Sequence, residues 1–242
     1  MKTITHFHNF IEPLPADVRA AIAQRFTERR VAEGDFIYRQ GEPSGELFQI
    51  VEGAARICNY TVDGKEAATV IFRPGDCFGE LGVLDGLPRV SYAMAEQDCL
   101  LQVLSKRDFD ALYAEYPELG RQITLMLCRR VRGLMGMNED AISLSLYERL
   151  GRALQRMTFS HGQKNDDDIL FIEISHEDLG KTLGASRQSV SKELKQLESQ
   201  GMIKVAYGRI LIVDLEALTE RFEQLLGMEQ LAPAYAPQDP QS

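Results

Sequence analysis

The sequence predicts an α+β fold in three parts: an N-terminal antiparallel β-roll, a long helix, and a C-terminal winged helix-turn-helix. Short apolar runs alternate with glycine and proline turns from Val31 to about Leu104, which is typical of a small roll or barrel. The chain is helical in pattern from Ser105 to Met157, with one break. Two short helices, a tight turn and a hairpin then fit within residues 175–214.

Composition excludes several classes of protein. The chain has 242 residues and a net charge of −9, so any basic patch for nucleic acid must be local. The sequence shows no signal peptide and no apolar run near the ~20 residues of a spanning helix. We therefore expect a cytoplasmic protein with no membrane partner, metal or haem. The cysteines have no C-x-x-C spacing, which indicates reduced, mostly buried thiols; they are Cys58, Cys77, Cys99 and Cys128.

Each strand of the roll is expected from its own apolar run. The runs are "DFIY", "LFQIVEG", "AARICNY", "AATVIF" and "CLLQVL", separated by "GEPSG", "VDGKE", "RPGD" and "DGLP". A short helix in "PLPADVRAAIAQRF" precedes them, and Pro15 and Asp17 mark its start.

The long helix begins after Tyr116, where Pro117 is well placed as a first helical residue. Its apolar positions recur in a heptad-like pattern, which favours a dimer seam. A helix packed on its own domain would show a similar pattern, and that alternative stays open. The expected seam residues are Leu127, Val131, Leu134 and Ala141.

A polar loop, Ser160–Asp168, leads into the C-terminal unit and is either a solvated loop or a contact for RNA polymerase. Beyond it, Ser175 starts the first helix, Ser186 caps the second, and Tyr207-Gly208 turns the hairpin. The expected domains are the roll with flanking helices (1–116), the dimerisation helix (117–145), the winged helix-turn-helix (146–218), and a C-terminal helix with a disordered tail (219–242).

The start of the second helix carries the functional signal. The N-terminal residues of a recognition helix contact base edges in the major groove. Arginine binds guanine and glutamine binds adenine bidentately, so Arg187 and Gln188 are expected to read bases. The expected DNA-binding residues are Ser186, Arg187, Gln188, Ser189, Ser191, Lys192 and Lys195, with Lys181, Lys204 and Arg209 as phosphate contacts.

Three motifs, together with the long helix, resemble the CRP/FNR family of cyclic AMP receptor-type transcription regulators. They are "GEPSGELFQIVEG", "PGDCFGELGVLDGLPR" and "LGKTLGASRQSVSKELKQLESQGMI". The resemblance implies a cyclic-nucleotide-binding-type β-roll and a homodimer that binds a palindromic operator in double-stranded DNA. It also implies an effector, cyclic AMP first, and a partner in RNA polymerase. The expected hinge lies between Met137 and Tyr147.

Relatives that bind cyclic AMP place it against the segment from Gly79 to Ser91. The resemblance implies that Glu80 accepts a hydrogen bond from the ribose and that Arg89 neutralises the cyclic phosphate, aided by the N–H groups of Gly79–Leu81. In the absence of ligand, Glu80 and Arg89 would alternatively pair with each other.

Val90 departs from the family pattern, because nucleotide binders usually carry serine or threonine directly after the arginine. Here the hydroxyl follows one residue later, at Ser91, and strand alternation would aim it away from the pocket. The loss of one charge-assisted hydrogen bond costs about 1.5–3 kcal/mol. The effector is therefore cyclic AMP or another ligand; alternatively, the roll has lost its effector and the protein acts constitutively or as a protein-docking module.

Other residues keep two interpretations. Asn138 either reads the base of the effector or fixes the register of the dimer. Cys77 is either a thiolate ligand or, as we favour, a buried structural cysteine. Gln188 stands where cyclic AMP receptor proteins carry glutamate, which predicts a related but different half-site. No nucleophile–base pair or phosphate-binding loop is present, so an enzyme is not expected.

Overall fold

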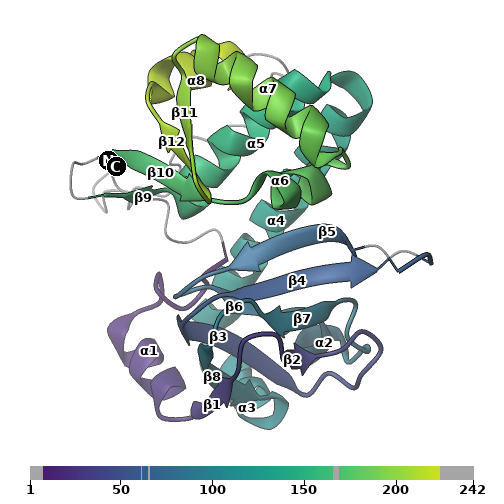
Figure 1. Cartoon of the computed structure of the whole chain (residues 1–242). Helices are drawn as coiled ribbons and strands as arrows, with labels where there is room; N and C mark the ends of the chain where they lie inside the picture. The colour runs from purple at the N-terminus through teal and green to yellow at the C-terminus, as the bar shows by residue number, and fades with distance from the viewer. Residues whose placement is uncertain (1–7, 61, 65, 166–168, 224–242) are drawn as a thin grey trace, which may run out of the picture. The chain divides into compact units, whose positions relative to one another are not determined.

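The computed structural model describes residues 8–60, 62–64, 66–165 and 169–223 (Figure 1). The chain divides into two compact units, and the division falls between Arg130 and Val131. This point lies inside the long helix α4 (Pro117–Ser143), so each unit contains one part of that helix. None of the helices in the described residues is long and apolar enough to cross a membrane.

The N-terminal unit is built on two four-stranded antiparallel sheets with the strand orders β1-β8-β3-β6 and β2-β7-β4-β5. Its elements before α4 are α1 (Ala16–Ala23), β1 (Thr27–Val31), β2 (Phe36–Tyr38), β3 (Glu46–Glu52), β4 (Ala55–Tyr60), β5 (Glu66–Phe72), β6 (Cys77–Phe78), α2 (Glu80–Asp85), β7 (Tyr92–Ala95), β8 (Cys99–Ser105) and α3 (Lys106–Glu115). The predicted antiparallel roll is therefore confirmed.

Residues from both sheets bury a common core that is rich in aromatic rings. Phe48 of β3 and Phe78 of β6 stack with their ring centroids 5.2 Å apart, and Tyr38 of β2 lies 5.9 Å from Phe48. Aromatic pairs at these separations add to the gain from burial alone. The core therefore joins the two sheets. Its rings Tyr38, Phe48 and Phe78, here called the aromatic floor, lie against the segment that begins at Gly79.

Helices α3 and α4 follow the sheets, and the predicted break between them is confirmed. The hydroxyl of Ser105 accepts a hydrogen bond from the backbone N–H of Asp108 and so caps α3. Tyr116 ends α3 in an extended conformation, and Pro117 is the first residue of α4. The buried face of these helices packs on α1 and consists of Phe109, Leu112, Leu119, Ile123 and Met126.

The expected helical stretch to Met157 has a second break that the periodicity did not indicate. Helix α4 ends at Ser143, and α5 (Leu146–His161) starts behind a capping box in which Ser145 and Glu148 exchange hydrogen bonds. The expected loop from Ser160 is also partly wrong, since α5 continues to His161 and β9 (Gln163–Lys164) follows. Residues 166–168 of that loop lie outside the described residues.

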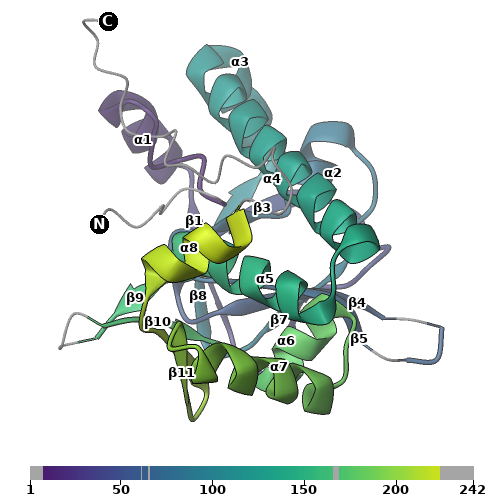
Figure 2. The ribbon, with the colours of Figure 1, turned by 90° about the horizontal axis from the view of Figure 1, so that it is seen from above.

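The predicted winged helix-turn-helix is confirmed. Figure 2 shows α6 beside α7 and β11 alongside α7. The strand order of the sheet is β11-β12-β10-β9. Gly184 ends the first helix with a φ of 62°, and Ser186 caps the second helix by accepting from the N–H of Ser189. The elements are β10 (Leu170–Glu173), α6 (His176–Leu183), α7 (Arg187–Ser199), β11 (Ile203–Ala206), β12 (Arg209–Ile212) and α8 (Leu215–Glu223).

Helix α8 runs across the boundary expected at residue 218, and the predicted disordered tail beyond residue 223 lies outside the described residues. A buried polar cluster ties the end of α4 to α5 and α8. Arg152 forms an ion pair with Asp140, with Nε and Oδ1 2.8 Å apart, and its Nη1 donates to the carbonyl of Phe222, 3.0 Å away. Arg156 also pairs with Asp140. The ion pairs of Arg152 and Arg156 with Asp140 therefore hold α5 against the end of α4, beyond the break at Ser145.

Candidate functional site

The residue before α2 is Gly79, and a side chain at this position would displace its neighbours Arg89 and Glu46. Gly79 has a φ of +83°, a region that L side chains rarely adopt. A Cβ added there would lie 2.7 Å from Nη1 of Arg89 and 3.1 Å from the carbonyl oxygen of Glu46. The predicted residues Gly79 and Arg89 are therefore in direct contact, and the glycine makes room for the guanidinium.

Arg89 is a buried cation held by neutral groups. Its Nη1 donates to the carbonyl of Gly79 at 3.0 Å and its Nη2 to the carbonyl of Glu46 at 2.7 Å. The guanidinium lies over the ring of Tyr38, 4.3 Å from the centroid, while its Nε has no hydrogen-bond partner in the described part of the chain. Burial lowers the pKa of Arg89. Among the described residues Arg89 makes no ion pair, so its guanidinium is available to pair with a bound anion.

Glu80 pairs with Arg130 of α4. The alternative expectation, a pair between Glu80 and Arg89, is therefore wrong. Oε1 of Glu80 lies 2.5 Å from Nη1 of Arg130, and the Glu80 carboxylate is 3 % exposed. Arg130 also donates from Nη2 to the carbonyl of Cys77 at 2.7 Å and from Nε to Nδ1 of His8 at 3.1 Å. The two predicted charges, Glu80 and Arg89, thus have separate partners.

Sequence reasoning missed Arg130 altogether. The signal for it was available in the helical spacing: Ile123, Met126 and Arg130 follow at steps of three and four, and the first two are fully buried. A cation on the buried stripe of an amphipathic helix needs a partner of opposite charge. Glu80, the first residue of α2, is that partner.

Val90 and Ser91 do not follow the alternation expected of a strand. Val90 is 57 % exposed, whereas Ser91 is buried and its hydroxyl forms a hydrogen bond with Tyr38. The two residues lie in a bend before β7 begins at Tyr92, so the alternation of a strand does not apply to them. Burial raises the pKa of Tyr38 to about 12, against the opposing charge of Arg89. Ser91 and Arg89 therefore meet at the same buried phenol.

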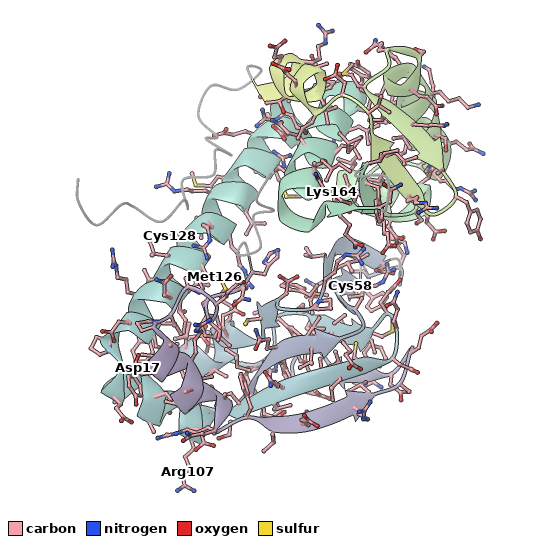
Figure 3. All side chains as sticks on the ribbon, turned by 90° about the vertical axis from the view of Figure 1, so that its left-hand side faces the viewer. Asp17, Cys58, Arg107, Met126, Cys128 and Lys164 are labelled. Atoms are coloured by element: carbon pink, nitrogen blue, oxygen red, sulfur yellow. The ribbon has the colours of Figure 1, made fainter. Side chains whose placement is uncertain are left out.

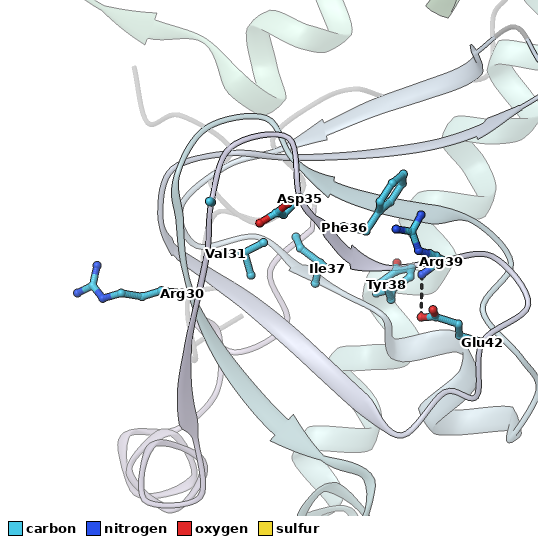
Figure 4. Close-up of a pocket in the computed structure, with 9 residues that line it drawn as sticks. Arg30, Val31, Asp35, Phe36, Ile37, Tyr38, Arg39 and Glu42 are labelled. Carbon is cyan, nitrogen blue, oxygen red and sulfur yellow. Dashed lines mark hydrogen bonds between the residues drawn. The ribbon is translucent and has the colours of Figure 1, made fainter.

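A separate hollow of about 480 Å³ lies where the edge strands β1 and β2 face each other (Figure 4). Its charged lining residues are Arg30, Asp35, Arg39 and Glu42. The guanidinium of Arg39 stacks 3.8 Å from the ring of Phe36, and its backbone N–H donates to Glu42. The hollow shares Tyr38 with the neighbourhood of Arg89.

The predicted seam residues divide into two groups. Leu127 is half-buried and packs on the core of the N-terminal unit, which is the alternative that the sequence left open. Val131 and Leu134 are 54 % and 66 % exposed, and Ala141 is exposed as well. Further exposed apolar residues of α4 are Met135, Met137 and Ile142. Asn138 is exposed and belongs to the C-terminal unit, so its two interpretations stay predictions.

The cysteines behave as structural thiols, with one exception. Burial raises the pKa of the Cys77 thiol. Cys58 and Cys99 are buried too, whereas Cys128 is exposed on α4, two residues beyond the fully buried Met126 (Figure 3). In the part of the chain that the structure describes, no group of three His, Cys, Asp or Glu side chains is arranged to hold a metal ion.

The recognition helix α7 is anchored by one face and presents the other to solvent. Val190, Leu194 and Leu197 are fully buried. The predicted contacts that are exposed are Ser186, Arg187, Gln188, Lys192 and Lys195, and those that are half-buried are Ser189 and Ser191. The hydroxyl of Ser191 lies 2.8 Å from Nδ1 of His176.

The expected phosphate contacts are of two kinds. Lys181 forms ion pairs with Glu177 and Asp178 of its own helix. Lys204 and Arg209 are exposed on the two strands of the wing, which turns at the fully exposed Tyr207. The wing cations are therefore open to a polyanion, and Lys181 is already neutralised.

Comparisons with known proteins agree with both units. The cyclic nucleotide-binding domain family matches residues 28–116, and the Crp-like helix-turn-helix domain family matches residues 148–221. The transcriptional regulator LdrP of Thermus thermophilus is 30 % identical over 192 residues, which cover 78 % of this chain and 94 % of LdrP. The CRP-like cAMP-activated global transcriptional regulator of Mycobacterium tuberculosis is 27 % identical over 84 % of this chain and 91 % of its own length.

Solved structures point the same way. The crystal structure of a CRP-family transcriptional regulator from Thermus thermophilus superposes with a TM-score of 0.63 at 27 % identity, covering 81 % of this chain and 96 % of the other. Its fold, the two matched domain families and the relatives all carry the same assignment. The chain is a DNA-binding transcription regulator that belongs to the CRP/FNR family.

Proposed function

We propose that this regulator acts in the cytoplasm as a homodimer that binds a palindromic operator and is controlled by an anionic effector, a cyclic nucleotide, in the β-roll. One observation carries the effector site. Arg89 is buried over the aromatic floor, and among the residues that the structure describes it donates only to carbonyl oxygens and its Nε has no hydrogen-bond partner. A buried guanidinium with unused donors favours a phosphate group as its ligand.

A cyclic nucleotide suits the other groups at this site. The match to the cyclic nucleotide-binding domain family covers Glu80, Arg89 and Ser91. Ser91 is buried beside Tyr38, so a hydroxyl is available on the same side as Arg89 despite Val90. The mycobacterial relative is described as cAMP-activated, which makes cyclic AMP the first ligand to test. We assign the chain no catalytic role.

The dimer and its DNA contacts follow from the two exposed surfaces. The exposed apolar residues of α4, including Val131 and Leu134, favour burial against a second copy. Two recognition helices in such a dimer would meet half-sites about 10 bp apart. Arg187 would read guanine and Gln188 adenine in each half-site. RNA polymerase would be the partner of the bound dimer.

A second function is favoured by the pair between Arg130 and Glu80. This pair occupies the carboxylate that would bind a ribose hydroxyl. A roll closed in this way would bind a smaller anion at Arg89 or none, and the protein would then regulate constitutively or through a docked protein.

Titration calorimetry of the wild type and two variants separates these functions. Cyclic AMP, cyclic GMP and cyclic di-GMP are titrated into the wild type, Arg89→Ala and Arg39→Ala. Arg39 is the matched control, because it is an arginine of the same unit that stacks on an aromatic ring in the separate hollow. Binding that is lost in Arg89→Ala and kept in Arg39→Ala supports the proposal. No heat with any nucleotide, in a protein that still binds DNA, contradicts it and favours the second function.

A further inference from the structure

His176 joins the first helix of the helix-turn-helix to the recognition helix. It is the first residue of α6, and its Nδ1 lies 2.8 Å from Oγ of Ser191 on α7. Both side chains are half-buried, and Ser191 lies about one turn of α7 from the exposed Arg187 and Gln188. The contact therefore stands at the end of α7 that faces DNA in a recognition helix.

The chemistry of this pair depends on one proton. When the neutral imidazole carries its ring hydrogen on Nε2, the Ser191 hydroxyl donates to Nδ1. When the ring gains a proton from the solvent, Nδ1–H donates to the Ser191 oxygen, and the hydroxyl hydrogen of Ser191 is released from that contact. Protonation thus reverses the hydrogen bond without breaking the contact. It leaves two donors, the Nε2–H of His176 and the O–H of Ser191, for an external acceptor.

The surroundings favour the neutral form of the ring in the free protein. Burial lowers the pKa of His176, and the positive charge of Arg187 from α7 lowers it further. The carboxylates nearest in the chain, Glu177 and Asp178, are engaged with Lys181. From α5, Arg149 donates to the carbonyl of Leu183 at the far end of α6. A phosphate anion near the pair would reverse this balance, because a nearby negative charge favours the charged ring.

We propose that His176 and Ser191 form a proton-linked contact to the DNA backbone, in which a phosphate oxygen accepts from both side chains once His176 is charged. The inference rests on the operator binding proposed above and adds a phosphate contact to it. Because His176 takes up a proton when DNA binds, its pKa is higher in the complex than in the free protein. The affinity for DNA therefore rises as the pH falls through the interval between these two pKa values. A shift of one pKa unit gives about a tenfold tighter half-site.

The test uses the full chain and a palindromic duplex selected from a random library by the wild type. Proton uptake on binding is measured by calorimetry in two buffers of different ionisation enthalpy, at about pH 6.5. The variants are His176→Gln, which keeps a hydrogen-bonding group opposite Ser191, and Ser191→Ala. Ser199→Ala is the matched control, because the Ser199 hydroxyl lies on the same helix and, among the described residues, donates only to the carbonyl of Gln196.

We expect the wild type and Ser199→Ala to take up protons and to bind more tightly as the pH falls. His176→Gln should lose this uptake and match the wild type only at high pH, whereas Ser191→Ala should keep the uptake and bind less tightly at low pH. Equal uptake in His176→Gln and the wild type overturns the inference. Should His176→Gln fail to fold, the ring resonances of wild-type His176 decide: a pKa that does not rise on adding the duplex also overturns it. If the wild type selects no duplex from the library, the result overturns the proposed operator binding, on which this inference rests.

Discussion

Arg130 of α4 donates to Glu80 at the first turn of α2, with Nη1 and Oε1 2.5 Å apart. Both side chains are largely shielded from solvent, with exposed fractions of 18 % and 3 %. The same guanidinium also binds the carbonyl of Cys77 and the ring of His8. Arg130 of the long helix thus contacts the first residue of α2, strand β6 and the segment before α1.

Arg130→Ala should therefore destabilise the N-terminal unit strongly. Removing one partner of a buried pair leaves the Glu80 carboxylate uncompensated, which costs about 3–5 kcal/mol. Urea unfolding of this variant and of Arg132→Ala, an exposed arginine two residues along α4, measures the difference. A loss in Arg130→Ala no larger than in Arg132→Ala would show that water already satisfies Glu80.

Gly79→Ala should abolish effector binding at Arg89, because the new Cβ would lie 2.7 Å from its Nη1. The left-handed backbone adds a strain of roughly 1–2 kcal/mol for any L residue. Gly86→Ala is the control: Gly86 has a φ of +73° but no atom within 4 Å of an added Cβ. Calorimetry with cyclic AMP should show binding in Gly86→Ala alone. Equal binding by both variants would mean that Arg89 can move aside without cost.

The loss of folding stability at alkaline pH should depend on Tyr38. Its pKa is about 12 in the folded protein, whereas an exposed tyrosine titrates near 10. Between these values the unfolded chain has released the proton and the folded chain retains it. The free energy of unfolding then falls with rising pH by about 1.4 kcal/mol per pH unit. Denaturant unfolding should show this fall in the wild type and in Tyr207→Phe, whose ring is fully exposed. Tyr38→Phe should make the fall shallower by this amount and leave the part that comes from the buried Cys77 thiol, whereas an unchanged slope would assign the whole fall to other groups.

Ser145→Ala should weaken the junction between α4 and α5. The serine accepts from the backbone N–H of Glu148 while the Glu148 carboxylate accepts from the N–H of Ser145. Loss of such a cap costs about 1 kcal/mol. Thermal unfolding measures this loss, with Ser143→Ala, an exposed serine two residues earlier, as control. Equal melting temperatures for the two variants would show that the cluster around Asp140 alone fixes the start of α5.

Arg187→Ala should relax the preference for one guanine in each half-site and cost about 1–3 kcal/mol of binding. Lys195→Ala, on the same exposed face of α7, should weaken all duplexes alike, because a phosphate contact carries no base preference. Binding to a panel of single-base variants of the selected duplex distinguishes the two effects. Uniform weakening in Arg187→Ala would place that arginine on the backbone.

The sequence predicted those parts of the fold whose signals are local. Apolar runs between glycine turns located five strands, and serine caps located α6 and α7 to the residue. Strand β6 escaped notice because it spans only two residues. Strand β7 was also missed, although its four residues exceed the three of β2, which was located. Helical spacing could indicate that Arg130 lies on a buried face, but it could not indicate that Glu80 is its partner, because fifty residues separate the two. Only the fold brings that helix against α2.

Strand β1, "TERRV", escaped notice for a different reason: three of its five residues are charged. It is the outermost strand of its sheet in the described part of the chain, paired only with β8. A free sheet edge is a template on which a second chain can add a strand, and charged side chains are the usual protection against this. The charges of Glu28, Arg29 and Arg30 that conceal β1 in the sequence therefore also protect the roll from edge-to-edge aggregation. Replacing them with apolar residues would make the strand easier to recognise in the sequence and the protein harder to keep in solution.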